Sequence, residues 1–306
     1  MRERFPRISL GKLCGWFGIT RQAWYRHVRD CLQSSIEEEL VIKEVRAIRA
    51  SHPKMGTRKL YAKLQPFINS HGIKMGRDAL FDLLAQHHLL VRRRKRRVST
   101  TLSHHWLRKY PNLIKDKVAT RPNEIWVSDI TYWKIKEGLH LYISFITDAY
   151  SKKIAGYQVA DNMEAVQSIA ALQMALCAFE GAEGHLPLTH HSDRGIQYCS
   201  GPYVKLLKDY HIEISMTETG DPRDNAIAER VNGIIKSEYL EACEAGNLNE
   251  AKEILNSVIK LYNEDRPHLS IGNMVPEFVH NNGVEVKKLW KNYYRKSTTI
   301  VNQLQD

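Results

Sequence analysis

The stretch from His190 to Glu238 reads HHSDRGIQYCSGPYVKLLKDYHIEISMTETGDPRDNAIAERVNGIIKSE, and it carries two acids in contrasting settings. Asp193 closes a short apolar run, residues 188–192, and is followed by an Arg-Gly turn signal, so we expect it at the end of a strand. Glu229 lies among apolar residues that recur at helical spacing, so we expect it on a helix. We expect Asp224 to cap that helix, because Pro222 cannot continue a preceding element.

A third acid, Asp129 in WVSDITYW, lies inside a run of β-branched and aromatic residues that predicts a central strand, residues 125–135. An acid in such a strand is costly to bury unless it is paired or bound to a metal. Asn225 and Asn232 stand at i−4 and i+3 from Glu229, so all three share one helix face. Two strand ends and one helix face therefore predict a carboxylate site for Mg²⁺, which prefers oxygen ligands. Two such ions roughly 4 Å apart can activate an attacking oxygen and stabilise a leaving one.

Four phrases occur in the order WVSDITYW, HSDRGIQYCS, GDPRDNAIAERVNGIIKSE and YNEDRPHLSIGNMVPEF. With these phrases the chain, over about residues 40 to 280, resembles insertion-sequence transposases of the DDE type in the retroviral-integrase superfamily. It is most similar to the OrfB catalytic product of elements that encode an OrfA/OrfB pair. The resemblance implies that Asp129, Asp193 and Glu229 are the catalytic, metal-binding acids, supported by Asn225 and Asn232, with two Mg²⁺ or Mn²⁺ ions. It also implies cleavage at terminal inverted repeats of double-stranded DNA, strand transfer into target DNA, and a circular intermediate.

Each acid also has a plainer interpretation. A lone Asp at a strand end is often a turn residue or a cap, and a lone Glu on a helix is usually solvated. Asp148, in FITDAYS, ends another apolar run and is the rival acid; we interpret it as a structural turn residue. Two alternative functions remain at this point: a metal-dependent nuclease of the ribonuclease-H superfamily, and a non-catalytic DNA-binding regulator.

The charge is divided unevenly along the 306 residues, whose formal net charge is +11. Residues 1–120 hold 26 Lys and Arg against 9 Asp and Glu, whereas the remainder holds 19 against 25. A basic front and a mildly acidic back suit a DNA-binding part joined to a carboxylate site. Six consecutive cations, Arg92, Arg93, Arg94, Lys95, Arg96 and Arg97, predict steeply salt-dependent phosphate binding.

Several classes of protein are disfavoured. The five scattered cysteines form no CxxC pair, which argues against a disulfide framework, a zinc ribbon and the zinc module of retroviral integrases. We interpret the pairs His87-His88 and His104-His105 as surface or phosphate-facing residues. No apolar run is long enough to span a membrane, and the N-terminus lacks the apolar core of a signal peptide. We therefore expect a cytoplasmic, nucleoid-associated protein.

The first ninety residues predict helices. Residues 8–29 outline a helix-turn-helix, with Ser9 and Thr20 as caps, a break at Gly18, and Arg21 and Arg26 as candidate DNA contacts. Residues 37–50 predict an amphipathic helix. A helix capped by Thr57 and ending near Pro66 would carry Arg58 and Lys59 as further candidate contacts. Residues 77–88 predict another helix.

From residue 123 the pattern changes to three strands, a helix, then alternating strands and helices, which is the order of a ribonuclease-H-like fold. The predicted fold class is an α/β core of this kind, with a mixed five-stranded sheet and flanking helices, preceded by small all-α helix-turn-helix modules. The predicted domains are 1–35 and 36–91 (helical modules), 92–120 (basic linker), 121–280 (catalytic core) and 281–306 (tail). We expect Arg266, in YNEDRPH, to contact DNA phosphate or the scaffold; a helix-terminal turn is the alternative.

Partners follow from the resemblance and from the chain itself. Similar proteins are often made with, or fused to, an OrfA product that carries a helix-turn-helix and a leucine zipper. Residues 37–50 amount to about two heptads, fewer than the three or four a coiled coil needs. Because two DNA ends must be held together, we expect a homo-oligomer on DNA. Without DNA or an OrfA-type partner we expect a monomer or a weak dimer.

Overall fold

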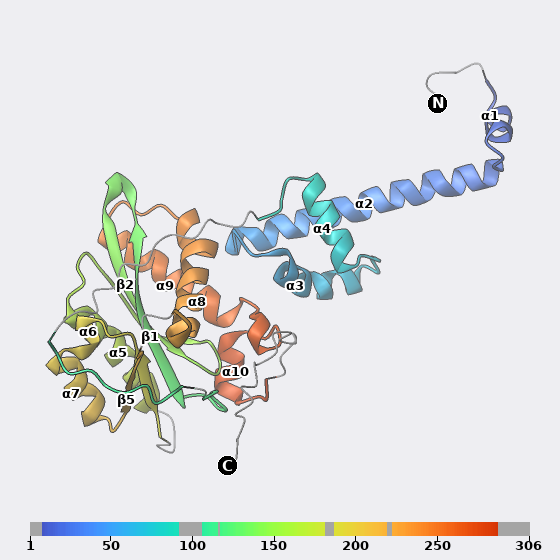
Figure 1. Cartoon of the computed structure of the whole chain (residues 1–306). Helices are drawn as coiled ribbons and strands as arrows, with labels where there is room; N and C mark the ends of the chain where they lie inside the picture. Colours follow the sequence, from blue (N-terminus) through green and yellow to red (C-terminus); the bar gives the residue numbers. More distant parts are fainter. Residues whose placement is uncertain (1–7, 92–105, 116, 181–186, 219–221, 287–306) are drawn as a thin grey trace, which may run out of the picture. The chain divides into compact units, whose positions relative to one another are not determined.

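The computed structural model describes residues 8–91, 106–115, 117–180, 187–218 and 222–286 (Figure 1). The chain divides into two compact units, Met1–Arg94 and Lys95–Asp306. The cation run Arg92–Arg97 and the pair His104-His105 lie outside the described residues.

The second unit is built on a five-stranded mixed sheet in the order β3-β2-β1-β4-β5. The pairs β1–β2 and β2–β3 are antiparallel, whereas β1–β4 and β4–β5 are parallel. The strands are β1 (Ile125–Lys134), β2 (His140–Asp148), β3 (Ile154–Ala160), β4 (Thr189–Ser192) and β5 (Glu213–Met216). This confirms the predicted mixed five-stranded sheet, in which three consecutive strands are followed by two that alternate with helices, with ends that shift by one or two residues.

Helices cover both faces of this sheet (Figure 1). One core holds Trp126 of β1 with α5 (Ala165–Glu180) and α7 (Gly201–Asp209). The opposite face packs on α8 (Ala226–Ile234) and α9 (Leu248–Glu264). Because strand side chains alternate, Ile125, Val127 and Asp129 share the α8 face, while Trp126 and Ser128 point the other way.

Gly156 allows β3 and α5 to approach closely. A Cβ atom at this position would lie 2.1 Å from the Ala171 carbonyl oxygen and 2.9 Å from the Ala175 backbone nitrogen. Backbone cannot move away as a flexible side chain can, so the absence of a side chain sets the spacing of this layer.

Short elements that the sequence did not predict complete the unit: η1 (Lys136–Gly138), α6 (Ile196–Cys199), η2 (Pro222–Asn225), the π-helix η3 (Ile235–Tyr239), η4 (Leu240–Ala242), η5 (Leu269–Ile271) and α10 (Pro276–Asn282). The later part of the predicted linker is not free of the core. Leu107 and Tyr110 pack against the α5 side, and the Leu113 N–H donates to the Ser215 hydroxyl at 2.9 Å.

In the first unit, α1 (Leu10–Trp16) is capped by Ser9 and followed by Gly18, whose φ of 65° requires the left-handed region. Thr20 caps α2, also as predicted. However, α2 is one helix, Arg21–Ser51, where the sequence predicted two. No Gly or Pro interrupts these 31 residues, so nothing ends the helix at the predicted boundary between residues 35 and 36.

A small core joins the end of α2 to α3 (Thr57–Ser70) and α4 (Arg77–Gln86). Gly56, not Thr57, is the N-cap of α3, and Thr57 is instead buried. The helix also continues past Pro66, because Ile68 packs into this core beyond it. Four described cysteines, Cys14, Cys177, Cys199 and Cys243, are free thiols. Among the described residues, no helix combines the length and apolarity that crossing a membrane requires.

Candidate active site

The register of β1 and β4 sets the two aspartates at one level of the sheet. Ser128 pairs with Ser192, the last residue of β4, so Asp129 and Asp193 are the next residue on each of two neighbouring parallel strands. Asp129 lies inside β1, as the strand predicted over residues 125–135 implies; the expectation that two strand ends meet at the site is wrong for this acid. Neighbouring strands are about 4.8 Å apart, so the register brings the two acids close together.

Helix α8 is fixed to β1 by one side-chain amide on each side of Glu229. The Asn225 amide nitrogen donates to the Ser128 carbonyl oxygen at 2.8 Å, and the Asn232 amide nitrogen donates to Asp129 Oδ2 at 2.8 Å. Both asparagines are buried, and their Oδ1 atoms make no hydrogen bond within the described part of the chain. Asn225, not Asp224, is the N-cap, because residues 222–225 form a 3₁₀ turn. Glu229 lies in the first turn of α8 and is exposed.

The electrostatics of Asp129 connect the three acids. Burial and the nearby carboxylates of Asp193 and Glu229 raise the pKa of Asp129 to about 7, although hydrogen bonds from Ile130 and Asn232 act in the opposite direction. Within the described ranges, no three His, Cys, Asp or Glu side chains are gathered as a ready metal-ligand group. The three carboxylates are therefore near enough to raise the pKa of Asp129 but do not form a ready-made ligand group. Repulsion between like charges accounts for this spacing.

Asp193 is oriented by the turn that follows it. The Gly195 N–H donates to Asp193 Oδ1 at 2.9 Å. A Cβ atom on Gly195 would lie 2.9 Å from that same oxygen, so any side chain there would displace the carboxylate. The turn signal in the sequence predicted a turn but did not predict this contact.

His191, two residues before Asp193, joins β4 to the segment that leads into α8. Its Nε2 lies 3.1 Å from the Asp224 carbonyl oxygen, which can only accept, so Nε2 carries the proton. Nδ1, 2.8 Å from the Ser215 hydroxyl, then accepts a hydrogen bond from it. Burial lowers the pKa of His191 to about 4, in keeping with a neutral ring.

On the opposite face of β1, His190 forms a second buried polar group. Its Nε2 lies 2.6 Å from the Ser128 hydroxyl and 2.9 Å from the Tyr203 hydroxyl. Burial, and then the neighbouring His191, lower the pKa of His190 to about 3, so the ring is neutral. Its Nδ1 and the hydroxyl of the adjacent Tyr198 are buried without a hydrogen-bond partner in the described residues. Neither histidine could be given a role from the sequence, where their position before Asp193 was the one signal.

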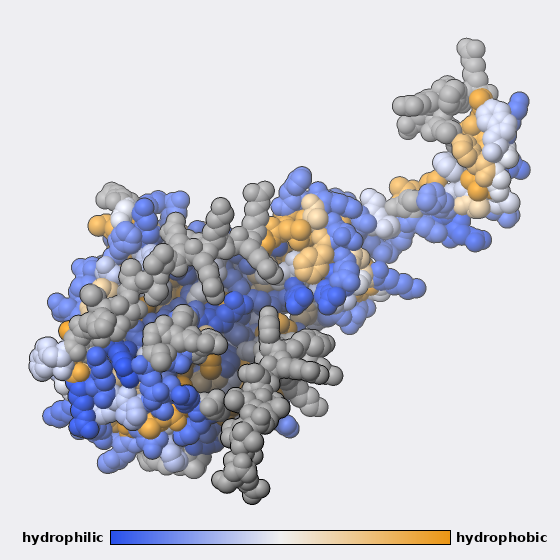
Figure 2. Space-filling view, viewed as in Figure 1, coloured by the Kyte–Doolittle hydropathy of each residue, from blue (hydrophilic) through white to orange (hydrophobic). Residues whose placement is uncertain are grey.

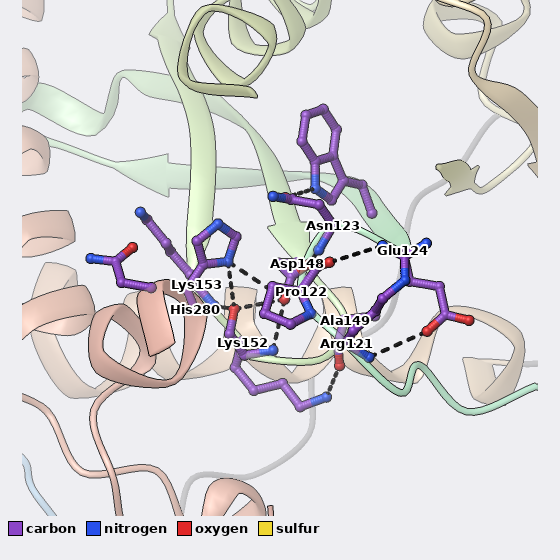
Figure 3. Close-up of polar contacts among 12 residues, drawn as sticks. Arg121, Pro122, Asn123, Glu124, Asp148, Ala149, Lys152, Lys153 and His280 are labelled. Carbon is purple, nitrogen blue, oxygen red and sulfur yellow. Dashed lines mark hydrogen bonds and ion pairs between the residues drawn. The ribbon is translucent and has the colours of Figure 1, made fainter. Parts of the chain in front are cut away.

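The rival acid, Asp148, has a full set of donors at the β2–β3 turn (Figure 3). Its two oxygens accept from the Asn123 N–H at 2.8 Å, the Ser151 N–H at 2.7 Å and the Ser151 hydroxyl at 2.6 Å. His280 Nδ1 of α10 lies 3.8 Å away and 3.1 Å from the Ser151 hydroxyl. Burial opposes ionisation, yet the nearby His280 ring and the hydrogen bonds from Ser151 leave the pKa of Asp148 below its ordinary value. The interpretation of Asp148 as a structural turn residue is confirmed.

The candidate DNA contacts divide into two groups. Arg21, Arg26 and Arg58 are exposed on the early turns of α2 and α3, and Lys59 is partly exposed. Arg266 is 1% exposed and donates from Nε and Nη2 to the two Glu238 oxygens at 2.8 and 2.9 Å. Of its two predicted roles, Arg266 therefore has the scaffold role. It cannot reach DNA phosphate, because it is buried and its Nε, Nη1 and Nη2 all donate within the protein.

A five-stranded mixed sheet in this order, with helices on both faces, defines a ribonuclease-H-like core, the class to which integrase and transposase catalytic cores belong. Two family models described as integrase core domain match the chain, at residues 119–222 and 210–276. The uncharacterized 31 kDa protein of insertion element IS600 from Shigella sonnei is 35% identical, covering 86% of this chain and 96% of that protein. The transposase for insertion sequence element IS629, also from Shigella sonnei, is 29% identical, covering 90% and 92%. Transposase InsF for insertion sequence IS3A from Escherichia coli K12 is 26% identical over 90% of this chain and 94% of its own length. The chain belongs to the insertion-sequence transposases with a DDE integrase core.

Among solved structures, the HTLV-2 integrase catalytic core domain in complex with magnesium is 23% identical, covering 52% of this chain and 97% of that one, with a TM-score of 0.42. A chain of the simian T-cell lymphotropic virus intasome in complex with PP2A regulatory subunit B56 gamma is 17% identical, covering 80% of this chain and 76% of that one, with a TM-score of 0.46. Both likenesses are distant and partial.

Proposed function

We propose that Asp129, Asp193 and Glu229 are the catalytic acids of this transposase and hold two Mg²⁺ or Mn²⁺ ions between them. The observation that carries the proposal is the register: Asp129 and Asp193 follow the Ser128–Ser192 pair, and Asn225 and Asn232 fix the helix of Glu229 against the same strand. The raised pKa of Asp129 supports it, since acids that raise one another's pKa favour a cation among them.

The residues present fit hard divalent cations. All three candidate ligands are carboxylates, and the buried amide oxygens of Asn225 and Asn232 add unpaired oxygen acceptors close by. Mn²⁺ also suits such oxygen donors. Divalent ions bound there would act as Lewis acids toward the attacking and leaving oxygens.

The chain's own residues then position the reactants. In the first step, water attacks the phosphorus at an element end, the bond to the 3′ oxygen breaks, and a 3′ hydroxyl is left. In the second step, that hydroxyl attacks a phosphodiester of target DNA in the same site and displaces another 3′ oxygen. Asn232 holds Asp129 in one orientation, and Gly195 does the same for Asp193 through its N–H. Catalysis by position and charge neutralisation needs this rigidity more than it needs a protein nucleophile.

The DNA substrates are the terminal inverted repeats of the element and a target duplex, joined through a circular intermediate. Arg21, Arg26, Arg58 and Lys59 contact this DNA, and the cation run at residues 92–97 contacts its phosphates. Two ends must be held together, so the active species is a homo-oligomer on DNA, which an OrfA-type partner assists. Such a protein works at the nucleoid.

The test replaces each acid with its amide: Asp129→Asn, Asp193→Asn and Glu229→Gln. Each should lower cleavage of an end-containing duplex at least about 1,000-fold and leave DNA affinity unchanged. Each should also remove the rise in melting temperature that Mg²⁺ or Mn²⁺ gives the unaltered protein, because a ligand charge is lost with little change of shape.

Asp209→Asn, at an exposed acid near the end of α7, is the matched control and should behave like the unaltered protein. Near-normal cleavage by any of the three amide variants would remove that residue from the site. Cleavage without joining of the 3′ end to target DNA would favour a plain nuclease over a transposase.

A further inference from the structure

The two ends of helix α2 differ in their surroundings. Val41, Ile42 and Val45 are buried in the core shared with α3 and α4. In contrast, none of the described side chains between Arg21 and Leu40 is buried. This first part of the helix, about 30 Å long, lies beyond α3 and α4 in Figure 1. Most of the stability of a helix in a protein comes from packing of one of its faces, so packing from outside would stabilise this part of α2.

The uncovered part of α2 carries an apolar ridge at four-residue intervals. Leu32 is 61% exposed, Ile36 55% and Leu40 39%, and Val28 is partly exposed one interval earlier. Seven of the eighteen large exposed apolar side chains in the described residues fall between Trp16 and Leu40. Figure 2 shows exposed hydrophobic surface over α1 and the start of α2. Ridges of i±4 spacing pack against each other in the commonest class of helix–helix contact.

The charges along this segment of α2 complement those of a second copy only when the two helices are antiparallel. Residues 21–30 hold three Arg and one Asp, whereas residues 33–44 hold four Glu and one Lys. A parallel pair of such helices would oppose like charges, and an antiparallel pair opposes unlike charges. Arg26 and Glu37 are eleven residues apart, which places them within about 20° on the same side of the helix. An antiparallel pair centred near Leu32 therefore puts Arg26 of each copy beside Glu37 of the second copy.

We propose that the ridge from Val28 to Leu40 binds the same ridge of a second copy of this chain, antiparallel and about a two-fold axis near Leu32. An interface of this kind is isologous and closes as a dimer. The ridge spans only about 18 Å, so its free energy is small and the dimer is weak, with dissociation in the micromolar range or above. Its use in holding two element ends rests on the proposed function, whereas the association does not require DNA.

Sedimentation velocity of the full chain without DNA tests the ridge, over protein concentrations from about 1 to 100 µM. We expect concentration-dependent dimer formation, and a dissociation constant at least about tenfold weaker for Leu32→Gln, since Gln keeps helix propensity and removes apolar area. Leu139→Gln is the matched control, because Leu139 is similarly exposed, at 55% against 61% for Leu32, but lies outside α2. Circular dichroism checks that helix content is preserved. A monomer at all concentrations, or equal effects of the two variants, would overturn the proposal. A monomer would indicate that the ridge binds a different polypeptide.

Charge exchange tests the direction of pairing. Arg26→Glu and Glu37→Arg should each weaken dimer formation about threefold or more, and the double variant should restore it, because both crossed pairs are then re-formed with reversed sign. No recovery in the double variant would exclude the antiparallel arrangement. These measurements omit DNA because Arg26 is also a proposed DNA contact. Normal dimer formation by a chain that shows no metal-dependent cleavage would count against the proposed function alone. Metal-dependent cleavage by a chain that forms no dimer would count against the interface alone.

Discussion

Asp129 on β1 and Asp148 at the end of β2 are acids on adjacent strands with opposite surroundings. Asp148 accepts three hydrogen bonds from Asn123 and Ser151, beside His280, and its pKa is lowered despite complete burial. Asp129 accepts from Asn232 and Ile130, faces two further acids, and its pKa is raised to about 7. A carboxylate supplied with donors stabilises the fold, whereas one surrounded by other carboxylates stores unfavourable charge that a cation would offset.

This comparison predicts that the two amide substitutions have crossed effects on stability and catalysis. Asp148→Asn should lower the free energy of unfolding by about 3 kcal/mol, because a new amide donor faces the donors of Asn123 and Ser151 and the negative charge beside His280 is lost. Asp129→Asn should leave the free energy of unfolding unchanged or raise it, because it removes a repelling charge. Urea unfolding at neutral pH without divalent ions measures both.

Catalysis should show the reverse order. Protein carrying Asp148→Asn, assayed at a temperature where it is folded, should cleave end-containing DNA within a few-fold of the unaltered chain. Asp129→Asn should be inactive. If Asp148→Asn instead abolished cleavage while its circular dichroism stayed native, Asp148 would move from the scaffold to the reaction centre and the comparison would fail.

Asn232 should give the next largest effect. It donates to Asp129 Oδ2, so Asn232→Leu should lower cleavage about 10- to 100-fold by releasing that carboxylate, the range typical of groups that orient metal ligands. The Mg²⁺ concentration that gives half-maximal activity should rise, whereas the KM for DNA should not. Asn281→Leu is the control, since Asn281 is exposed and donates to Glu277 within α10, away from the three acids. An unchanged Mg²⁺ dependence would leave Asn232 a packing residue.

How far the sequence predicted these two acids depends on the range of the interactions. The strands, the helix of Glu229 and its face with Asn225 and Asn232 follow local periodicity, and the structure confirms those elements. The β1–β4 register could not be read locally, nor could the contacts of Asp148 with Asn123 and His280, which come from separate segments; only Ser151, three residues after Asp148, is a local donor. The same limit explains Arg266, whose partner Glu238 is 28 residues away. Interaction range does not account for the error in α2, where two helices were predicted and one exists. The absence of Gly and Pro over residues 21–51 was visible in the sequence.

The face of β1 opposite Asp129 sharpens the comparison through pH. Burial holds the pKa of His190 at about 3 against an ordinary value of 6.5, so the unfolded chain binds a proton there that the folded chain does not. Between these values the unfolded state carries more protons, hence stability rises with pH and is lost on acidification from about 6.5 toward 3. One group contributes at most about 1.4 kcal/mol per pH unit in this window. His190→Gln should flatten that slope in urea titrations at pH 5 to 6.5, and its stability at neutral pH should fall because Ser128 and Tyr203 lose the ring nitrogen they share. Tyr203→Phe should keep the slope, since the buried imidazole remains. An unchanged slope in His190→Gln would mean that other groups govern the acid sensitivity, and that burial of His190 on the face of β1 opposite Asp129 does not contribute to it.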